Sequence, residues 1–187
     1  MRVNAGFSKG KKLKSLSGKE VRPTSDKVKA AVFDTLGQNL EGKNFLDLFS
    51  GTGGMGIEAL SRGAEYAVFI EKNTDCVKII YENLKITGLD SRARVIKTEV
   101  FRGLAKLQRE KLTFDYIYMD PPYFGPLYVP VMEAVSEKGL FEKDGILIVE
   151  HFKNIILPEK VFGLRQGKEK KYGDTIITYY FKKEEVL

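Results

Sequence analysis

The chain has 187 residues, of which 43% are hydrophobic, and it carries a net charge of +6. This length and composition suit one domain with a hydrophobic core of its own. Because the chain has one cysteine and one histidine, an internal disulfide framework and a metal site of thiolate and imidazole ligands are excluded, and we expect no metal.

The positive charge is concentrated in the N-terminal residues. Residues 1–29 contain nine Lys or Arg and two Asp or Glu, a net charge of +7, whereas the rest of the chain carries −1. A basic segment ahead of a near-neutral body indicates a polyanionic partner, although a solvated tail would have the same composition. A turn is predicted at residues 22–24, and apolar residues at helical spacing predict a helix over residues 25–38, with Thr24 or Ser25 as its N-cap.

Strand and helix patterns alternate from residue 44 onward. Because each strand is followed by a helix, the alternation predicts a parallel sheet with right-handed crossovers. The expected strands are residues 45–50, 66–71, 93–98, 114–119 and 145–150, and the expected helices are residues 56–62, 74–87, 100–110 and 129–138. Two further strand-like runs, residues 161–167 and 175–182, flank a Lys/Gly turn and predict a terminal antiparallel hairpin.

These elements predict an α/β fold with a Rossmann-like, seven-stranded, mostly parallel sheet. We expect residues 1–40 to form a small basic extension, a hairpin plus a helix, and residues 41–187 to form the main domain. No apolar run is long enough for a signal peptide or a membrane span, so we expect a soluble cytoplasmic protein. His151 is expected at the surface, at the end of its strand, and Cys76 as buried filler in a helix.

The first strand runs into a glycine-rich loop. Gly51, Gly53 and Gly56 satisfy the pattern G-x-G-x-x-G at the start of a helix, where backbone N–H groups can face a ligand. Glu71 ends the next strand, where a carboxylate can bind both ribose hydroxyls. The bare pattern fits NAD. Asp47, at the end of the first strand, would however repel a pyrophosphate and suit a cationic nucleoside such as S-adenosylmethionine.

The fourth strand ends in Asp120-Pro121-Pro122-Tyr123. Tandem prolines cannot donate to a strand ladder and they hold the chain extended, so the strand must stop there. Fixed carbonyl acceptors beside a carboxylate and an aromatic ring suit a planar amino group, which indicates chemistry on an exocyclic amine. The alternative is a proline-terminated strand whose aspartate caps the next helix.

Asp47, the two glycines of Gly51-x-Gly53, Glu71 and the Asp-Pro-Pro-Tyr motif follow one another on successive strands. In this order they resemble the class I methyltransferases that modify exocyclic amino groups, which act on DNA adenine, protein glutamine or RNA guanine. Two readings from other classes stay open: an NAD-dependent oxidoreductase, which Asp47 disfavours, and a non-catalytic RNA-binding module, which leaves the two motifs unexplained.

Motifs along the whole chain narrow the resemblance to the RsmD family, which methylates guanine N2 in 16S rRNA. The chain is too short for a large target-recognition domain, and its basic N-terminus favours a nucleic-acid substrate over a protein. The segments that carry the resemblance are residues 2–13 (RVNAGFSKGKKL), 22–28 (RPTSDKV), 56–64 (GIEALSRGA) and 172–180 (YGDTIITYY).

The resemblance implies a methyltransferase domain over residues 41–187. S-adenosylmethionine would be its cofactor, S-adenosylhomocysteine its product, and 16S rRNA or a small-subunit assembly particle the partner of a monomeric enzyme. The expected cofactor contacts are Asp47, Phe49, Ser50, Gly51, Thr52, Gly53, Glu71, Lys72, Glu99, Val100 and Asp120. The expected catalytic residues are Asp120, Pro121, Pro122 and Tyr123, and the expected RNA contacts are Lys9, Lys11, Lys12, Lys14, Arg22 and Lys27.

Guanine N2 is a weak nucleophile because its lone pair is delocalised into the ring. The Asp120 carboxylate and the Pro121 carbonyl are expected to accept its two hydrogens, which frees the lone pair, while Tyr123 stacks on the base. Two positions depart from the family pattern. Glu99 stands where Asp or Asn is common, and Lys27 stands where Arg is common.

Overall fold

The computed structural model describes residues 1–16, 26–122 and 127–182. The described residues form one eight-stranded sheet in the order β3-β2-β1-β4-β5-β8-β7-β6. The strands are β1 (Asn44–Leu48), β2 (Tyr66–Glu71), β3 (Ala93–Lys97), β4 (Phe114–Met119), β5 (Phe141–Phe152), β6 (Lys160–Val161), β7 (Leu164–Tyr172) and β8 (Thr175–Lys182).

Strands β1 to β5 are parallel to one another, and β6, β7 and β8 complete the sheet with antiparallel pairs. Chain order reverses between β1 and β4, which are hydrogen-bonded neighbours. In open α/β sheets, ligands bind beyond the carboxyl ends of the strands at such a reversal. The topology therefore places the end of β1, the end of β4 and the loops that follow them at one edge.

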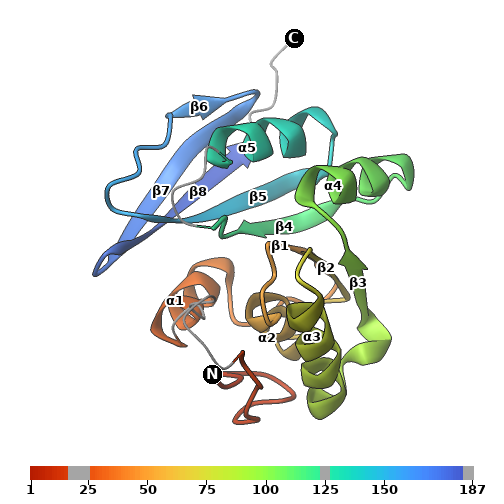
Figure 1. Cartoon of the computed structure of the whole chain (residues 1–187). Helices are drawn as coiled ribbons and strands as arrows, with labels where there is room; N and C mark the ends of the chain where they lie inside the picture. Colours follow the sequence, from red (N-terminus) through yellow and green to blue (C-terminus); the bar gives the residue numbers. More distant parts are fainter. Residues whose placement is uncertain (17–25, 123–126, 183–187) are drawn as a thin grey trace.

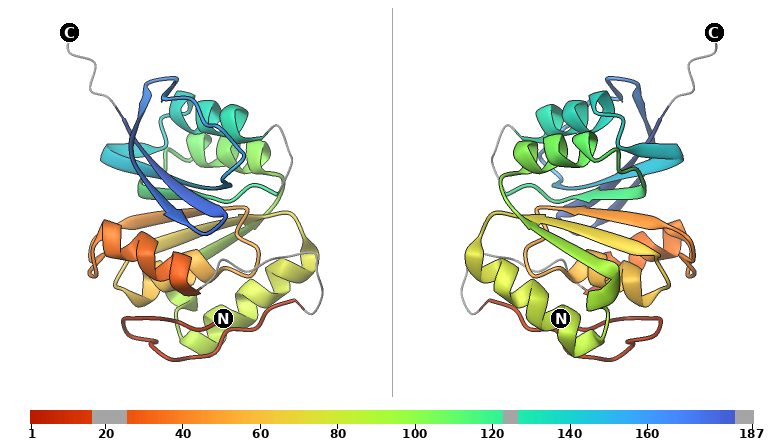
Figure 2. Two further views of the ribbon diagram at one scale, coloured as in Figure 1. Left: turned by 90° about the vertical axis from the view of Figure 1, so that its left-hand side faces the viewer. Right: turned by 90° about the vertical axis from the view of Figure 1, so that its right-hand side faces the viewer.

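Helices cover both faces of the sheet (Figures 1 and 2). The helices α1 (Asp26–Leu36), α2 (Gly54–Ser61) and α3 (Thr74–Thr87) lie on one face, and α4 (Val100–Arg109) and α5 (Tyr128–Glu137) lie on the other. A short 3-10 turn, η1 (Asp90–Arg92), precedes β3. Each face has its own buried cluster, and β1 contributes to both, with Phe45 in one and Leu46 and Leu48 in the other, as a central parallel strand should.

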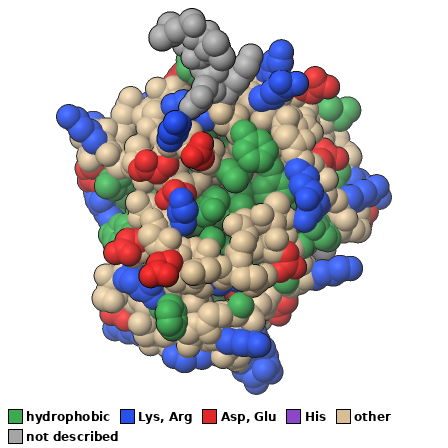
Figure 3. Space-filling model, turned by 180° about the vertical axis from the view of Figure 1, so that it is seen from behind, with side chains coloured by type: hydrophobic (Ala, Val, Ile, Leu, Met, Phe, Trp, Pro, Cys, Tyr) green, Lys and Arg blue, Asp and Glu red, His purple; other side chains and the backbone are tan. Residues whose placement is uncertain are grey.

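The fold class predicted from the sequence, a Rossmann-like α/β sheet with a terminal antiparallel hairpin, is confirmed. Every expected helix is present with small shifts of its ends. Strand β5 begins at Phe141, four residues before its expected start, and the strand expected over residues 161–167 is divided between β6 and β7, which gives eight strands in place of seven. Seen from behind, the molecule shows basic and acidic side chains spread around an apolar patch (Figure 3). Among the described residues, none of the helices has the length and apolar character that crossing a membrane requires.

The terminal hairpin differs from the prediction in its turn. The expected strand over residues 161–167 is interrupted at Phe162 and Gly163, both with positive φ, and the Lys/Gly run continues as β7 to a turn at Gly173. A side chain at Gly167 would meet the ring of Phe181, with a Cβ 2.3 Å from the ring. Gly167 is therefore required by packing between strands and not by a turn.

His151 is buried, which contradicts its expected place at the surface. Strand β5 continues to Phe152 and pairs with β8 there, so position 151 lies inside a ladder. The ring nitrogens lie 2.8 Å from the Thr178 hydroxyl and 3.0 Å from the Phe152 carbonyl oxygen. Burial lowers the pKa of the imidazole, which favours the neutral ring.

The N-terminal residues 1–16 pack against α2 and α3. Val3 and Leu13 belong to the buried cluster of that face, and Arg2 and Lys12 pair in an antiparallel bridge. The Asn83 side chain of α3 accepts the Lys14 N–H at 2.7 Å and donates to the Lys14 carbonyl at 3.1 Å. This part of the basic segment is thus a fixed, hairpin-like loop.

Candidate active site

A cavity of about 450 Å³ lies at the chain reversal, where β1, β2 and β4 end. Its size suits a small organic ligand. Twelve of the residues expected to bind cofactor or to catalyse line it: Asp47, Phe49, Ser50, Gly51, Thr52, Glu71, Lys72, Glu99, Val100, Asp120, Pro121 and Pro122. Gly53 is buried behind this wall, and Tyr123 lies outside the described residues.

The glycine loop turns sharply from β1 into α2. Gly53, the N-cap of α2, has φ 81°, and Phe49 has φ 58°, a conformation that non-glycine residues rarely adopt. Gly56 lets α2 approach the sheet closely, since a Cβ there would lie 2.3 Å from the ring of Phe69. Two glycines of the motif therefore have separate tasks, one in the turn and one in helix–strand packing.

Asp47 binds the backbone at the start of α2, directly after the glycine loop. Its carboxylate accepts the Gly56 N–H at 2.9 Å, and the side chain is buried at the cavity wall. Burial raises the pKa of Asp47 from 3.8 to about 8; the Gly56 hydrogen bond opposes the increase and the charge of Glu71 adds to it. At neutral pH the carboxyl is therefore mostly protonated, and a cation bound beside it would favour its ionised form.

Glu71 holds two backbone segments of the cavity. One carboxylate oxygen accepts the Gly51 N–H at 2.8 Å, and the other accepts the Asn73 N–H at 2.8 Å. A carboxylate offers about four acceptor directions, so two are left for ligand hydroxyls. Asn73 in turn caps α3 by accepting the N–H groups of Asp75 and Cys76.

Lys72 and Glu99 form an exposed ion pair at the cavity wall, with 3.5 Å between the ammonium and the carboxylate. Glu99 is also the N-cap residue of α4, although its side chain makes no cap bond. The expected contact of Glu99 with the cofactor would therefore compete with its ion pair to Lys72. Such exposed pairs are weak, so a ligand can displace this one at little cost.

Asp120, Pro121 and Pro122 form the cavity wall at the end of β4. Asp120 is half-buried and Pro121 is buried. Met119, the residue before Asp120, pairs with Val149, the residue before Glu150 of β5. Glu150 is buried and accepts a hydrogen bond from the Tyr118 hydroxyl, which also lines the cavity.

Several lining residues were missed from the sequence. Tyr118 alternates with Asp120 along β4, and this period of two could have revealed it. Met1 lines the cavity because the N-terminal loop packs there, with its sulfur 2.7 Å from the position of a Cβ on Gly54. Cys76 is buried as expected but also lines the cavity, and burial raises the pKa of its thiol to about 11.

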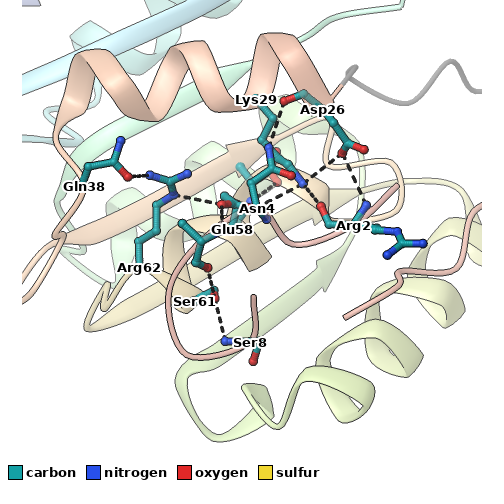
Figure 4. A network of polar contacts seen from close by, with 12 residues as sticks. Arg2, Asn4, Ser8, Asp26, Lys29, Gln38, Glu58, Ser61 and Arg62 are labelled. Carbon is teal, nitrogen blue, oxygen red and sulfur yellow. Dashed lines mark hydrogen bonds and ion pairs between the residues drawn. The ribbon is translucent and has the colours of Figure 1, made fainter. Parts of the chain in front are cut away.

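A buried ionic network fastens the N-terminal loop (Figure 4). The Glu58 carboxylate of α2 accepts the N–H groups of Asn4 at 2.8 Å and Ala5 at 3.0 Å. It also pairs with Lys29 of α1 at 3.2 Å and with the Arg62 guanidinium at 2.9 Å. Both cations are buried, so the charge of Lys29, counted with the basic segment in the sequence, is neutralised inside the protein.

The expected RNA-contacting residues differ in their surroundings. Lys9, Lys12 and Lys27 are exposed. The Lys11 ammonium donates to the Thr87 carbonyl at 3.1 Å, and the Lys14 ammonium pairs with Glu82 at 2.9 Å. Arg22 lies outside the described residues.

Comparison with known proteins assigns the chain to a family. Residues 1–181 match the family described as "Conserved hypothetical protein 95". The chain is 36% identical over 183 residues to "Putative rRNA methyltransferase YlbH" of Bacillus subtilis, covering 98% of this chain and 100% of that protein. It is 29% identical over 181 residues to "Ribosomal RNA small subunit methyltransferase D" of Haemophilus influenzae, covering 96% of this chain and 91% of that protein.

A solved structure matches nearly the whole chain. "Putative methyltransferase yhhF from Escherichia coli" superposes with a TM-score of 0.86 at 24% identity, covering 99% of both chains. The superposition shows that this chain has the same Rossmann-like fold, which is the fold of class I methyltransferases. With the family match over residues 1–181 and the relatives that share it, the chain is a methyltransferase and belongs to the RsmD family.

Proposed function

We propose that the protein transfers a methyl group from S-adenosylmethionine to the exocyclic N2 amine of a guanine in 16S rRNA. One observation carries the proposal: the cavity brings Asp47, Glu71 and the Asp120-Pro121-Pro122 segment together at one edge of the sheet. The two relatives, whose names describe rRNA methyltransferases, support ribosomal RNA as the substrate. The reaction would then take place in the cytoplasm, on free rRNA or on an assembling small subunit.

The residues at the cavity fit a cationic nucleoside. Glu71 has acceptor directions left for the ribose hydroxyls, and Asp47 supplies a carboxyl that a nearby positive charge would ionise. When bound, the cofactor supplies a methyl group already activated by its sulfonium. The protein's task is to place the accepting nitrogen in line with that methyl group and to exclude water.

Asp120 and Pro121 would hold that nitrogen. The Asp120 carboxylate and the Pro121 carbonyl would each accept a hydrogen bond from one N–H of the amine. These two hydrogen bonds make the nitrogen lone pair available for the new N–C bond. The methyl–sulfur bond breaks as the N–C bond forms, and the product is S-adenosylhomocysteine. The amine proton leaves to Asp120 or to solvent.

The direct test of this function is mass spectrometry of nucleosides from small-subunit rRNA. Cells with the gene should contain N2-methylguanosine at a position that is unmodified in cells without it, and purified protein with S-adenosylmethionine should restore it. If rRNA from both cells is identical and the protein instead methylates DNA adenine or protein glutamine, the proposed substrate is wrong.

Glu71→Ala is expected to weaken S-adenosylmethionine binding by about 1.5–3 kcal/mol, the scale of a lost charge-assisted hydrogen bond. The variant loses the acceptor for the ribose and for the Gly51 and Asn73 N–H groups. Calorimetry measures the effect, with Glu65→Ala as the control because Glu65 is exposed and precedes the same strand. Tight NAD binding by the wild type, or full cofactor affinity in Glu71→Ala, would contradict the assignment.

Cofactor binding at pH 7 is expected to release a proton from Asp47. Its pKa of about 8 keeps the carboxyl mostly protonated in the free protein, and a bound cation favours ionisation. Affinity should therefore rise as the pH rises toward 8. Calorimetry in buffers with different ionisation enthalpies counts the protons released on binding. The Asp47→Asn variant, which keeps an acceptor for the Gly56 N–H, measures the proton release that comes from groups other than Asp47. Equal proton release by wild type and variant would rule out this titration.

A further inference from the structure

Phe7 is a large apolar side chain held out into solvent. Phe7 is 81% exposed, whereas the next residue, Ser8, is 3% exposed. The Phe7 N–H donates to the Ser61 carbonyl at 2.8 Å. The Ser8 N–H donates to the Ser61 hydroxyl at 3.0 Å (Figure 4). The Ser8 hydroxyl donates to the Thr87 carbonyl at 2.8 Å. The backbone that carries the ring is thus tied to both α2 and α3.

Gly6 explains how the loop comes so close to α2. It has φ +78°, and a Cβ at this position would lie 1.7 Å from the Ser61 carbonyl oxygen. Any other residue would push the loop off the helix. Gly6 contacts the end of α2 and Ser8 is buried, so the backbone between them directs the Phe7 side chain toward solvent.

The surroundings of the ring are basic. Residues 1–16 contain five Lys or Arg and no Asp or Glu, and Lys9 and Lys12 are exposed. The Arg92 guanidinium lies 6.0 Å from the centroid of the Phe7 ring, and Arg92 is itself held by the Ala64 and Leu60 carbonyls at 2.9 Å and 3.2 Å.

We infer that Phe7 and Arg92 form a stacking platform for an unpaired base of the RNA substrate, while Lys9 and Lys12 hold the flanking phosphates. The inference rests on the proposed function. Bases stack on exposed aromatic rings without regard to sequence, and a neighbouring guanidinium adds to the contact. An RNA is favoured over a protein partner because lysine is depleted at protein interfaces, whereas the loop that carries Phe7 also carries the exposed Lys9 and Lys12.

The loop connects this platform to the active site. Along α2, Met1 packs at Gly54 beside the cavity, Asn4 and Ala5 bind Glu58, and Phe7 is tied to Ser61. The eight residues of α2 span about 12 Å. The base that stacks on Phe7 would therefore belong to a nucleotide separated from the methylated guanine by only a short stretch of RNA backbone.

The test measures binding of transcribed 16S rRNA to the full chain at several salt concentrations. Phe7→Ala is expected to bind about 5- to 150-fold more weakly, the range for removal of one stacked base, with the salt dependence unchanged. Replacing Lys9, Lys11, Lys12 and Lys14 by Gln should instead flatten the log–log salt slope by about 0.7–0.9 for each phosphate that the protein no longer neutralises. Phe162→Ala is the matched control, because that ring is also exposed, at 59%, but lies by the terminal hairpin.

Fluorescence gives a second readout. The chain has no tryptophan, so Phe7→Trp introduces a single one at the platform. That variant is expected to keep wild-type RNA affinity and to be quenched when RNA binds, because the indole stacks on a base. Phe162→Trp should show no quenching. Circular dichroism and cofactor binding should be unchanged in the Phe7 and Phe162 variants, since both residues are exposed.

The outcomes separate the platform from the function. If the wild type binds and methylates rRNA but Phe7→Ala binds as tightly and Phe7→Trp is not quenched, the platform is wrong and the function stands. If Phe7→Ala binds naked rRNA normally but binds assembled subunits more weakly, Phe7 contacts a ribosomal protein and not a base. This result would also overturn the platform. A wild type that neither binds nor methylates ribosomal RNA would overturn the proposed function itself.

Discussion

Asp120→Ala is expected to abolish methyl transfer while S-adenosylmethionine affinity stays nearly unchanged. The carboxylate is proposed to act on the target amine, which reacts only after both ligands are bound. Removal of one preorganised group at a reacting centre typically costs about 10²–10³ in rate. A single-turnover measurement with saturating cofactor isolates this step from binding and product release.

Two further variants sharpen this test. Asp120→Asn keeps the shape and one acceptor oxygen but turns an NH2 group toward the amine, so it should be slower than wild type and faster than the alanine variant. Asp144→Ala removes an exposed carboxylate elsewhere and should turn over normally. Normal turnover by Asp120→Ala would show that the amine is not held by this residue.

Tyr123 belongs to the same motif and lies outside the described residues. Stacking on a base needs the ring and not the hydroxyl, so Tyr123→Phe should be mild and Tyr123→Ala severe, with a loss on the scale of about 1–3 kcal/mol. Equal losses in the two variants would mean that the hydroxyl, and not the stacked ring, is what the reaction requires.

Glu58→Gln is expected to lower the free energy of unfolding by about 3–5 kcal/mol, because it leaves the buried Lys29 and Arg62 cations uncompensated. For a domain of this size that corresponds to a fall in Tm of about 6–20 °C. Calorimetry or denaturant unfolding measures the change. The Asn4 and Ala5 N–H groups also lose their charged acceptor, so a protease should cut within residues 1–16 more readily.

The matched control is Glu82→Gln. Glu82 also pairs with a lysine of the N-terminal loop, Lys14, but both side chains are about half exposed. Such a pair contributes little, so the control should lose less than about 1 kcal/mol. If the two glutamine variants are equally stable, burial of the Glu58 network contributes nothing to stability, and the N-terminal loop must be held by its apolar contacts alone.

The sequence was sufficient to predict the sheet and much of the cavity wall. Apolar runs that alternate with amphipathic helices favour a parallel sheet with crossovers, and the carboxyl ends of parallel strands meet at one edge. Asp47 and Glu71 lie at the carboxyl ends of such strands and Asp120 directly follows another, so their meeting at the cavity was predictable without knowing any distance. The family resemblance followed from the order of the same residues.

Only the tertiary structure decided which charges are buried and which side chains complete the cavity. Lys29 and Glu58 are far apart in sequence, and nothing local distinguishes this lysine from the exposed Lys27 two residues earlier. Likewise Gly167 and Gly173 stand at the two ends of the segment that contains Lys168, Lys170 and Lys171, and only the pairing of β7 with β8, where Gly167 packs against the Phe181 ring, places the turn at Gly173. Periodicity reports the local conformation of a segment. Burial and pairing depend on contacts between segments distant in the chain, and these exist only once the fold has formed.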